Sequence, residues 1–592
     1  MKKGDLDKWI RLDECKNLLF FSQLVNELLF DYSIPSNRIS TLNSHFLCLD
    51  ALSAIGGIER HGVPEGTLKP IAEELYEALS KDPVFQSTTE SPLKYFIKYG
   101  DPCRISSKVS DLNYDELKKA IRAVNTKFFI DNKYYHSLHT QISDLIIKNE
   151  ESDQPKLFRL IKSLLTELVN LGYSQTYIYK VMTTLFWKPQ NPVISPTIIN
   201  DFFQKFSFEK GEYTVALKIN KHSLQKFLQF IELPVNDKLD LRTQSHIEKQ
   251  FASKGTGQAF LLIDYKALDP FKAAQTVKEN LSTNIAFYRL YDHEYRYNID
   301  SAKCGVYDGE NFYRVHQTKS AVFHTKIPSN KQISEKLHAY GKALSTVSRK
   351  DIPTLIHTAI FHAQALDSTS SENQLLDLWA LFETVLDISN RHTADRIVQV
   401  CTYLVPILKR KYIYSLFLQL SNDIKNYSDE KYNDIIGSSI SEREVVQHIF
   451  EFVTLNENVD KRLTFLKSCS DFPLLRERIE YYSIVFEKPL SVYNFVEKHA
   501  KSVKWQIMRI YRNRNLIIHN GDSMPYLDLL IENLHSYVDD FLEYTIESLA
   551  RNRSVDNMCQ ELFVNECDWI SDFSRNKNKE LSKEDVLKIL AI

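Results

Sequence analysis

Glycine is scarce in this chain: only 15 of its 592 residues are glycine, well below the usual share of about 7%. Tight hairpin turns depend on glycine, so this scarcity disfavours an all-β fold built from many hairpins. Leucine, isoleucine and lysine dominate long stretches instead. We therefore expect a mainly α protein.

Cysteine pairs and long apolar runs are also missing. The eight cysteines are scattered without a Cys-x-x-Cys pair, a spacing that supports neither a zinc site nor a disulfide framework. No run of about 18 apolar residues could form a membrane span, and the first residues lack the apolar stretch of a signal peptide. We expect a cytoplasmic protein, and no motif indicates a cofactor.

The chain has almost no excess of charge of one sign: it contains 74 basic and 76 acidic residues, and its net charge is -2. Long-range attraction to nucleic acid is therefore not expected. Any RNA-binding site must be a local group of lysine and arginine side chains.

Length and patterning divide the chain into four segments. A chain of 592 residues is too long for one hydrophobic core. Residues 1–205 show periodic apolar positions, which predict an N-terminal helical domain that acts as a scaffold or sensor. Residues 350–555 are again helical, and residues 556–592 form an accessory C-terminal segment.

The segment from 206 to 345 differs from its neighbours. Residues 213–219 alternate as a strand does, and residues 259–265 form a short apolar run. An Asp-Gly turn lies within residues 304–315, between strand-like flanks. We predict a small α+β module here.

The most specific chemical signal lies at the end of a predicted amphipathic helix. Arg514, Asn515 and His519 are followed by Asn520-Gly521, a pair that tolerates the left-handed conformation in which helices end. Arginine stays positively charged and can hold a phosphate, whereas a histidine side chain can exchange a proton near neutral pH. This combination suits RNA cleavage.

The cleavage reaction needs little else from the protein. RNA supplies its own nucleophile, the 2′-hydroxyl, so no metal is required to generate one. His519 would move a proton, and Arg514 would hold the scissile phosphate and stabilise the charge that builds on it. The products would carry a 2′,3′-cyclic phosphate and a 5′-hydroxyl.

Helix geometry places a condition on this site. Residues five apart on a straight α-helix differ by about 140° in direction. Arg514 and His519 can therefore converge only if the last turn is distorted or if two such helices meet. A homodimer with two-fold symmetry would bring two helices together.

Spacing alone does not identify the site. An Arg-x4-His pair is expected about once by chance in a chain of this length, and a second pair exists at Arg443 and His448. The residue after Arg443 is Glu444, whose negative charge would repel a phosphate. We interpret that second pair as surface or packing residues.

The context of the first pair resembles the HEPN superfamily. Arg514-Asn515-x-x-x-His519 is similar to its signature, in which a polar residue follows the arginine. Upstream, Trp379 and Glu383 lie in a segment, residues 375–386, that resembles the opening helix of the Apea-like HEPN branch; the preceding segment, residues 357–366, also fits it. The resemblance covers about residues 350–550, and the long separation of Trp379 from Arg514 suggests insertions, around residues 422–441.

The resemblance implies a dimerising helical bundle and a metal-independent endoribonuclease, frequently one that acts in phage defence or as a toxin. In such a site Glu383 could orient Arg514 or His519. From the residues alone, Glu383 is equally well explained as the partner of a buried arginine. Arg509 and Arg512 could contact RNA or could simply be solvated.

Two aromatic features could either pack in a core or belong to a functional site. Trp379 is expected in the core. The tyrosine-rich stretch 288–297 could stack unpaired bases, but packing in a hydrophobic core explains it more simply.

Two functional hypotheses follow. The first is an abortive-infection or toxin effector that cleaves tRNA or mRNA as a homodimer, with residues 1–345 responding to a phage-derived or protein trigger. The second is a non-catalytic protein whose helical bundle dimerises or binds RNA. Cleavage of RNA by the purified protein distinguishes them.

Overall fold

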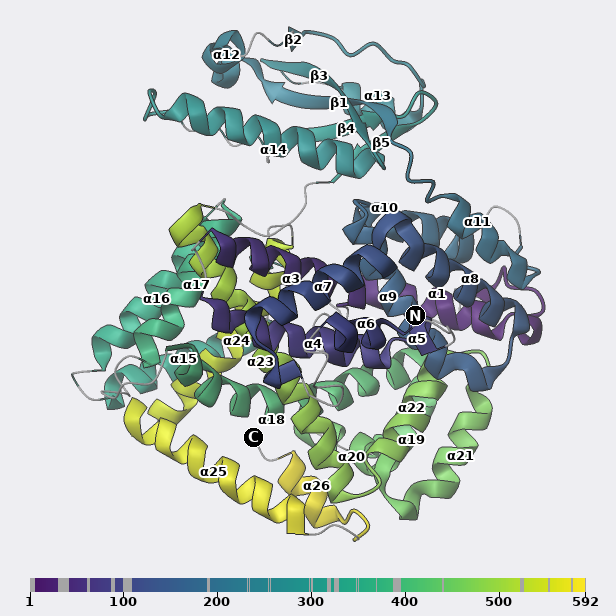
Figure 1. Cartoon of the computed structure of the whole chain (residues 1–592), viewed down its shortest axis with the longest axis vertical. Helices are drawn as coiled ribbons and strands as arrows, with labels where there is room; N and C mark the ends of the chain where they lie inside the picture. The colour runs from purple at the N-terminus through teal and green to yellow at the C-terminus, as the bar shows by residue number, and fades with distance from the viewer. Residues whose placement is uncertain are drawn as a thin grey trace. The chain divides into compact units, whose positions relative to one another are not determined.

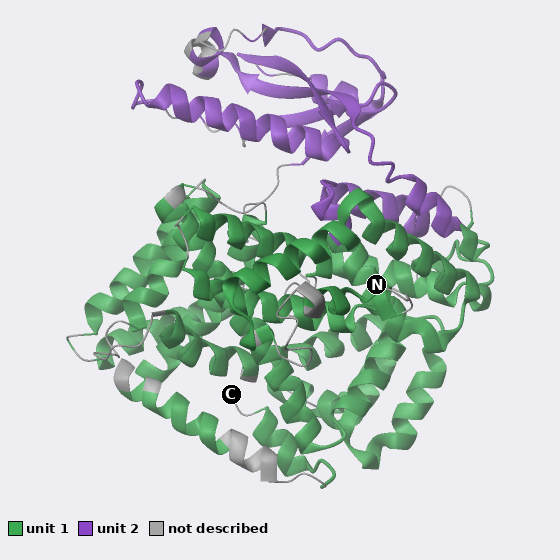
Figure 2. Cartoon of the chain, viewed as in Figure 1, with its two compact units in different colours: residues 1–166, 191–197, 320–592 green, residues 167–190, 198–319 purple. Residues whose placement is uncertain are grey.

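The computed structural model forms two compact units, shown in Figure 2. Unit 1 comprises residues 1–166, 191–197 and 320–592, and unit 2 comprises residues 167–190 and 198–319. The structure describes residues 6–29, 42–60, 64–86, 91–99, 109–188, 192–230, 233, 235–253, 255, 257–295, 297, 299, 302–316, 321–323, 329–347, 349, 351–368, 370–386, 396–438, 441–521, 526–551, 554–575 and 579–590.

The named elements of unit 1 are helices (Figure 1), and its described residues also include one isolated β-bridge between Trp9 and Val193. Its N-terminal helices are α1 (Lys16–Leu29), α3 (Ser44–Glu59), α4 (Leu68–Lys81), α5 (Pro83–Gln86), α6 (Pro92–Tyr99), α7 (Tyr114–Phe128), α8 (Lys133–Lys148) and most of α9 (Gln154–Asn170). Its C-terminal helices are α15 (Asn330–Thr346), α16 (Ile352–Asp367), α17 (Ser371–Leu386), α18 (Arg396–Tyr427), α19 (Asp429–Ile436), α20 (Glu442–Thr454), α21 (Val459–Ser468), α22 (Pro473–Val485), α23 (Pro489–Asn520), α24 (Leu527–Leu549), α25 (Val555–Arg575) and α26 (Lys583–Ile589).

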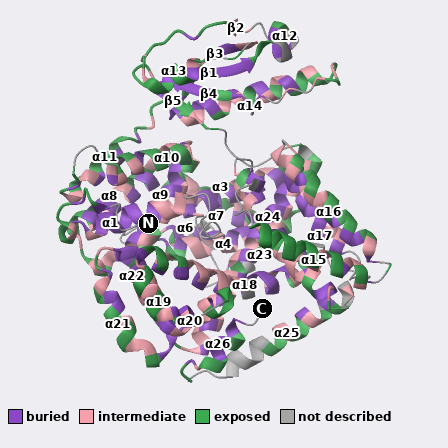
Figure 3. Cartoon of the chain, turned by 180° about the vertical axis from the view of Figure 1, so that it is seen from behind, coloured by how far each residue is buried: buried purple, intermediate pink, exposed green. Residues whose placement is uncertain are grey.

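Two helices of 32 residues, α18 and α23, pass through two hydrophobic cores. At 1.5 Å per residue each is about 48 Å long. The first core joins α16, α17 and α24 to the start of α18 and the end of α23. The second joins α19–α22 and α26 to the end of α18 and the start of α23. Figure 3 shows the buried faces of these helices. The second core accounts for the long separation of Trp379 from Arg514.

Buried ion pairs join the N-terminal helices of unit 1 to its C-terminal helices. Asp50 of α3 is fully buried and pairs with Arg509 and Arg512 of α23. It also accepts a hydrogen bond from the Tyr526 hydroxyl, and Arg509 pairs in addition with Glu74 of α4. A buried carboxylate is stable only where such partners compensate its lost hydration.

The pKa values of the two acids differ because their surroundings differ. Burial alone would raise the pKa of Asp50, but the attraction of Arg512 and Arg509 lowers it to about 2. Burial raises the pKa of Glu74 and outweighs the attraction of Arg509. Asp50 thus gains more from the two arginines than it loses by burial, whereas Glu74 does not.

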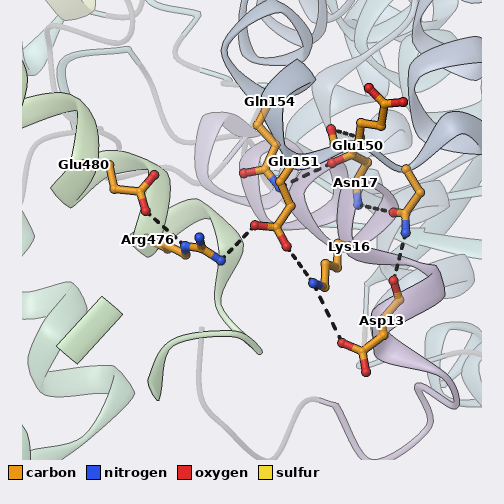
Figure 4. Close-up of polar contacts among 9 residues, drawn as sticks. Asp13, Lys16, Asn17, Glu150, Glu151, Gln154, Arg476 and Glu480 are labelled. Carbon is orange, nitrogen blue, oxygen red and sulfur yellow. Dashed lines mark hydrogen bonds and ion pairs between the residues drawn. The ribbon is translucent and has the colours of Figure 1, made fainter. Parts of the chain in front are cut away.

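A second, more exposed network joins α1 to α22 (Figure 4). Glu151, in the turn before α9, lies 2.6 Å from Lys16 Nζ and 2.8 Å from Arg476 Nη1. Arg476 also pairs with Glu480 one turn further on. The buried amide of Asn17 donates to two backbone carbonyl oxygens nearby. Because the ion pairs are partly exposed, each stabilises the fold by no more than about 1 kcal/mol.

Unit 2 contains an antiparallel five-stranded sheet with strand order β2-β3-β1-β4-β5. Its elements are α10 (Gln175–Met182), α11 (Ile199–Gln204), β1 (Gly211–Asn220), α12 (Lys221–Phe230), β2 (Val235–Asn236), α13 (His246–Ala252), β3 (Gln258–Ala267), α14 (Pro270–Arg289), β4 (Lys303–Tyr307) and β5 (Phe312–Val315).

Both faces of this sheet are covered. Val215 and Leu217 of β1 pack in the core that contains α14, whereas Ala216 faces the smaller core that contains Phe251 of α13. This explains why five consecutive residues of β1 are buried. Asp269 caps α14 and also accepts hydrogen bonds from Ser174 at the start of α10.

The predicted fold class is confirmed, since the chain is mainly helical with a small α+β module between helical segments. The three predicted strand segments all form strands, and Gly309 makes the predicted turn with a φ of 98°. Residues 1–205, taken as one segment on sequence grounds, are divided between the two units. Within the described residues, no helix has the length and apolarity needed to cross a membrane.

We expect Asp50→Asn to reduce the free energy of unfolding by about 3–5 kcal/mol. The amide leaves Arg512 buried without a countercharge, and urea unfolding followed by circular dichroism measures the loss. Glu59→Gln is the matched control, because Glu59 lies on the same helix in an exposed pair with Arg122. Its effect should stay within about 0.5 kcal/mol; equal effects of the two variants would contradict the role given to Asp50.

Candidate functional site

Helix α23 carries the predicted catalytic residues and ends where the sequence indicates. Gly521 has a φ of 62°, and its N–H donates to the carbonyl of Ile517 at 3.0 Å. A left-handed residue here turns the chain out of the helix at low steric cost. His519 consequently lies in the last turn, and the predicted helix end is confirmed.

Three of the four predicted catalytic residues lie together. Arg514 Nη1 donates to Asn515 Oδ1 at 3.1 Å, and Arg514 Nη2 lies 3.6 Å from Glu383 Oε2 on α17. The Arg514 side chain is 23% exposed. Its guanidinium therefore contacts two protein groups, and the side chain as a whole remains partly exposed.

Glu383 is itself fixed by Trp379. The Trp379 indole Nε1 donates to Glu383 Oε1 at 3.1 Å, one helical turn away on α17. Trp379 is 1% exposed, which confirms its predicted place in the core. Glu383 thus lies between the buried indole of Trp379 and the partly exposed side chain of Arg514.

His519 is exposed and does not join this group within one chain. Helix α23 continues as an α-helix to Asn520, so the last turn is not distorted. Arg514 and His519 consequently point in directions about 140° apart. Arg514 and His519 can therefore come together only if the α23 helices of two copies of the chain meet.

The structure places Arg509 and Arg512 in buried ion pairs, not on an RNA-binding surface. Their side chains are 2% and 4% exposed. Arg509 Nε lies 3.1 Å from Asp50 Oδ2. The countercharges come from residues more than 400 positions earlier in the chain, so helix pattern alone could not indicate this burial. In this structure the two arginines are not accessible to RNA.

The other sequence alternatives also have clear outcomes. His448 of the second Arg-x4-His pair is half-buried, and its ring hydrogen-bonds the carbonyl of Ile436 at 3.0 Å. Tyr288 and Tyr295 pack against the core of unit 2 and contact each other edge to face. Tyr291 is exposed instead, and Arg296 lies outside the described residues.

Sequence reasoning missed one group of potential metal ligands. His362 of α16 meets His535 and Asp539 of α24, and their ligand atoms lie within 4.8 Å of one another. The His535-x3-Asp539 spacing places two ligands on one helix face. The third ligand is 173 residues away, so only the tertiary structure brings it there.

Comparison with known proteins adds no assignment. No family model matches the chain, and no curated protein or solved structure matches it either.

We expect Glu383→Ala and Glu383→Gln to differ in stability although both remove the ion pair with Arg514. Alanine leaves the buried Trp379 N–H without this acceptor, at a cost of about 1–3 kcal/mol. Glutamine keeps an acceptor oxygen and should cost less than about 1 kcal/mol. Urea unfolding with tryptophan fluorescence measures both; equal losses would contradict the hydrogen bond between Trp379 and Glu383.

Proposed function

We propose that the protein is a HEPN-type endoribonuclease that acts as a homodimer. The observation that carries this proposal is the contrast among the three arginines of α23. Two are buried in structural ion pairs, whereas the Arg514 side chain is partly exposed and contacts Glu383 and Asn515. The likeness of these residues to the HEPN signature supports the same assignment.

In the proposed reaction, the ribose 2′-oxygen attacks the adjacent phosphorus and loses its proton. The bond to the 5′-oxygen breaks, and that oxygen leaves with a proton as a 5′-hydroxyl. Arg514 binds non-bridging phosphate oxygens and stabilises their growing negative charge. His519 of the second copy transfers a proton. The other product is a 2′,3′-cyclic phosphate, and DNA is not cleaved because it lacks the attacking hydroxyl.

The proposed cellular role is an abortive-infection or toxin activity against tRNA or mRNA. It rests on the family resemblance. The N-terminal helices of unit 1 contact α23 through Asp50 and Glu74. A phage-derived or protein trigger that altered these contacts would act directly on the helix that carries Arg514.

We expect Arg514→Ala and His519→Ala each to reduce RNA cleavage by about 10²–10⁴-fold. The assay incubates the purified full chain with total RNA and excess EDTA, and detects new 5′-hydroxyl ends by their labelling with polynucleotide kinase without prior dephosphorylation. Arg443→Ala is the matched control, because Arg443 is the exposed arginine of the second Arg-x4-His pair.

Unchanged cleavage by both site variants would refute the site. A wild-type protein that binds RNA without cutting it, including after expression during phage infection, would favour the second hypothesis, a non-catalytic RNA-binding or dimerising protein. A substrate with a 2′-deoxyribose at the cleaved position should resist wild-type enzyme.

Mixing the two inactive variants tests whether the site is shared between copies. If Arg514 of one copy works with His519 of the other, each mixed dimer retains one complete site. Random exchange of subunits should then restore about a quarter of wild-type activity. A mixture that stays inactive while native mass spectrometry detects mixed dimers would show that each site lies within one chain.

A further inference from the structure

His362, His535 and Asp539 form a compact group of potential ligands in unit 1. Asp539 follows His535 by one turn of α24, so both side chains lie on one helix face. His362 reaches them from α16. Its Nε2 lies 3.0 Å from His535 Nε2 and 3.5 Å from Asp539 Oδ1, and His535 Nε2 lies 3.8 Å from the same Oδ1.

These three separations fit the edges of a coordination sphere. Zinc lies about 2.0–2.1 Å from imidazole nitrogen and about 2.0–2.2 Å from carboxylate oxygen. Two ligands at such distances are about 3.0–3.4 Å apart in octahedral or tetrahedral geometry. The measured distances are in this range or a few tenths of an ångström longer, so small side-chain rotations suffice.

The two imidazoles can also be satisfied without a metal. A hydrogen bond between the Nε2 atoms requires one ring to carry its proton there and the other to leave that atom bare. A metal ion instead accepts electron pairs from both nitrogens and from the carboxylate. The two alternatives predict different behaviour towards added metal, and only the second uses all three residues.

The group is buried on one side and open to solvent on the other. The His535 side chain is 5% exposed. His362 and Asp539 are 25% and 46% exposed. An ion can therefore enter from solvent and keep a water molecule as a further ligand.

We propose that His362, His535 and Asp539 bind one divalent first-row transition-metal ion, with zinc as the best match. Two imidazoles and one carboxylate suit zinc and its neighbours, whereas magnesium prefers oxygen ligands. The ion links α16 to α24 in the core that also contains the end of α23. The site shares no residue with the proposed nuclease and does not depend on that function.

Zinc titration of the full chain, after removal of metals with a chelator, tests the proposal. Calorimetry should detect one zinc per chain at this site, and zinc should raise the melting temperature because it binds only the folded state. Cobalt should give the visible absorption of a nitrogen- and oxygen-ligated ion. Magnesium at the same concentration should neither bind at this site nor raise the melting temperature.

His362→Gln and Asp539→Asn should weaken zinc binding by roughly tenfold or more and abolish most of the zinc-induced rise in melting temperature. Both side chains are partly exposed, so the variants are expected to fold. His357→Gln is the matched control, because His357 is an exposed histidine on the same helix. Equal zinc affinity and equal thermal shift in all four proteins would overturn the proposal, and so would the absence of zinc binding by the wild type.

Discussion

The buried carboxylate of Asp50 is the constraint on which unit 1 depends most directly. A charge without water must be matched by charges nearby, and here the matching cations are Arg509 and Arg512 of α23. The cluster therefore fixes the rotation of α23 about its own axis relative to α3. That rotation sets the direction in which every other side chain of α23 leaves the helix.

The same rotation of α23 keeps Arg514 away from the Asp50 cluster. Arg509 and Arg512 are three residues apart, so they lie on one face of the helix and share Asp50. Arg514 is about 140° away from Arg509, where it meets Glu383 instead of Asp50. One helix thus carries two structural arginines and one accessible arginine. The division follows from helix geometry once the position of Asp50 is known.

Helix α23 belongs to two hydrophobic cores, one at each end. The end of α23 packs with α16, α17 and α24, the helices that carry Glu383 and the His362 group. Its beginning packs with α19–α22, which span residues 429–485; the family resemblance suggests an insertion around residues 422–441. Helices α18 and α23 therefore connect the second core directly to the core that contains the end of α23.

The sequence by itself determined the local structure: scarce glycine and apolar periodicity indicated helices, alternation indicated the strands, and Asn520-Gly521 indicated the end of α23. These signals act between neighbouring residues, so they are readable without a fold. It also singled out Arg514, Asn515, Glu383 and His519. The tertiary structure alone decided that Arg509 and Arg512 are buried, that residues 1–166 join the C-terminal unit, and that His362 meets His535. Each of these depends on charges or ligands far apart in the chain, which only packing brings into contact.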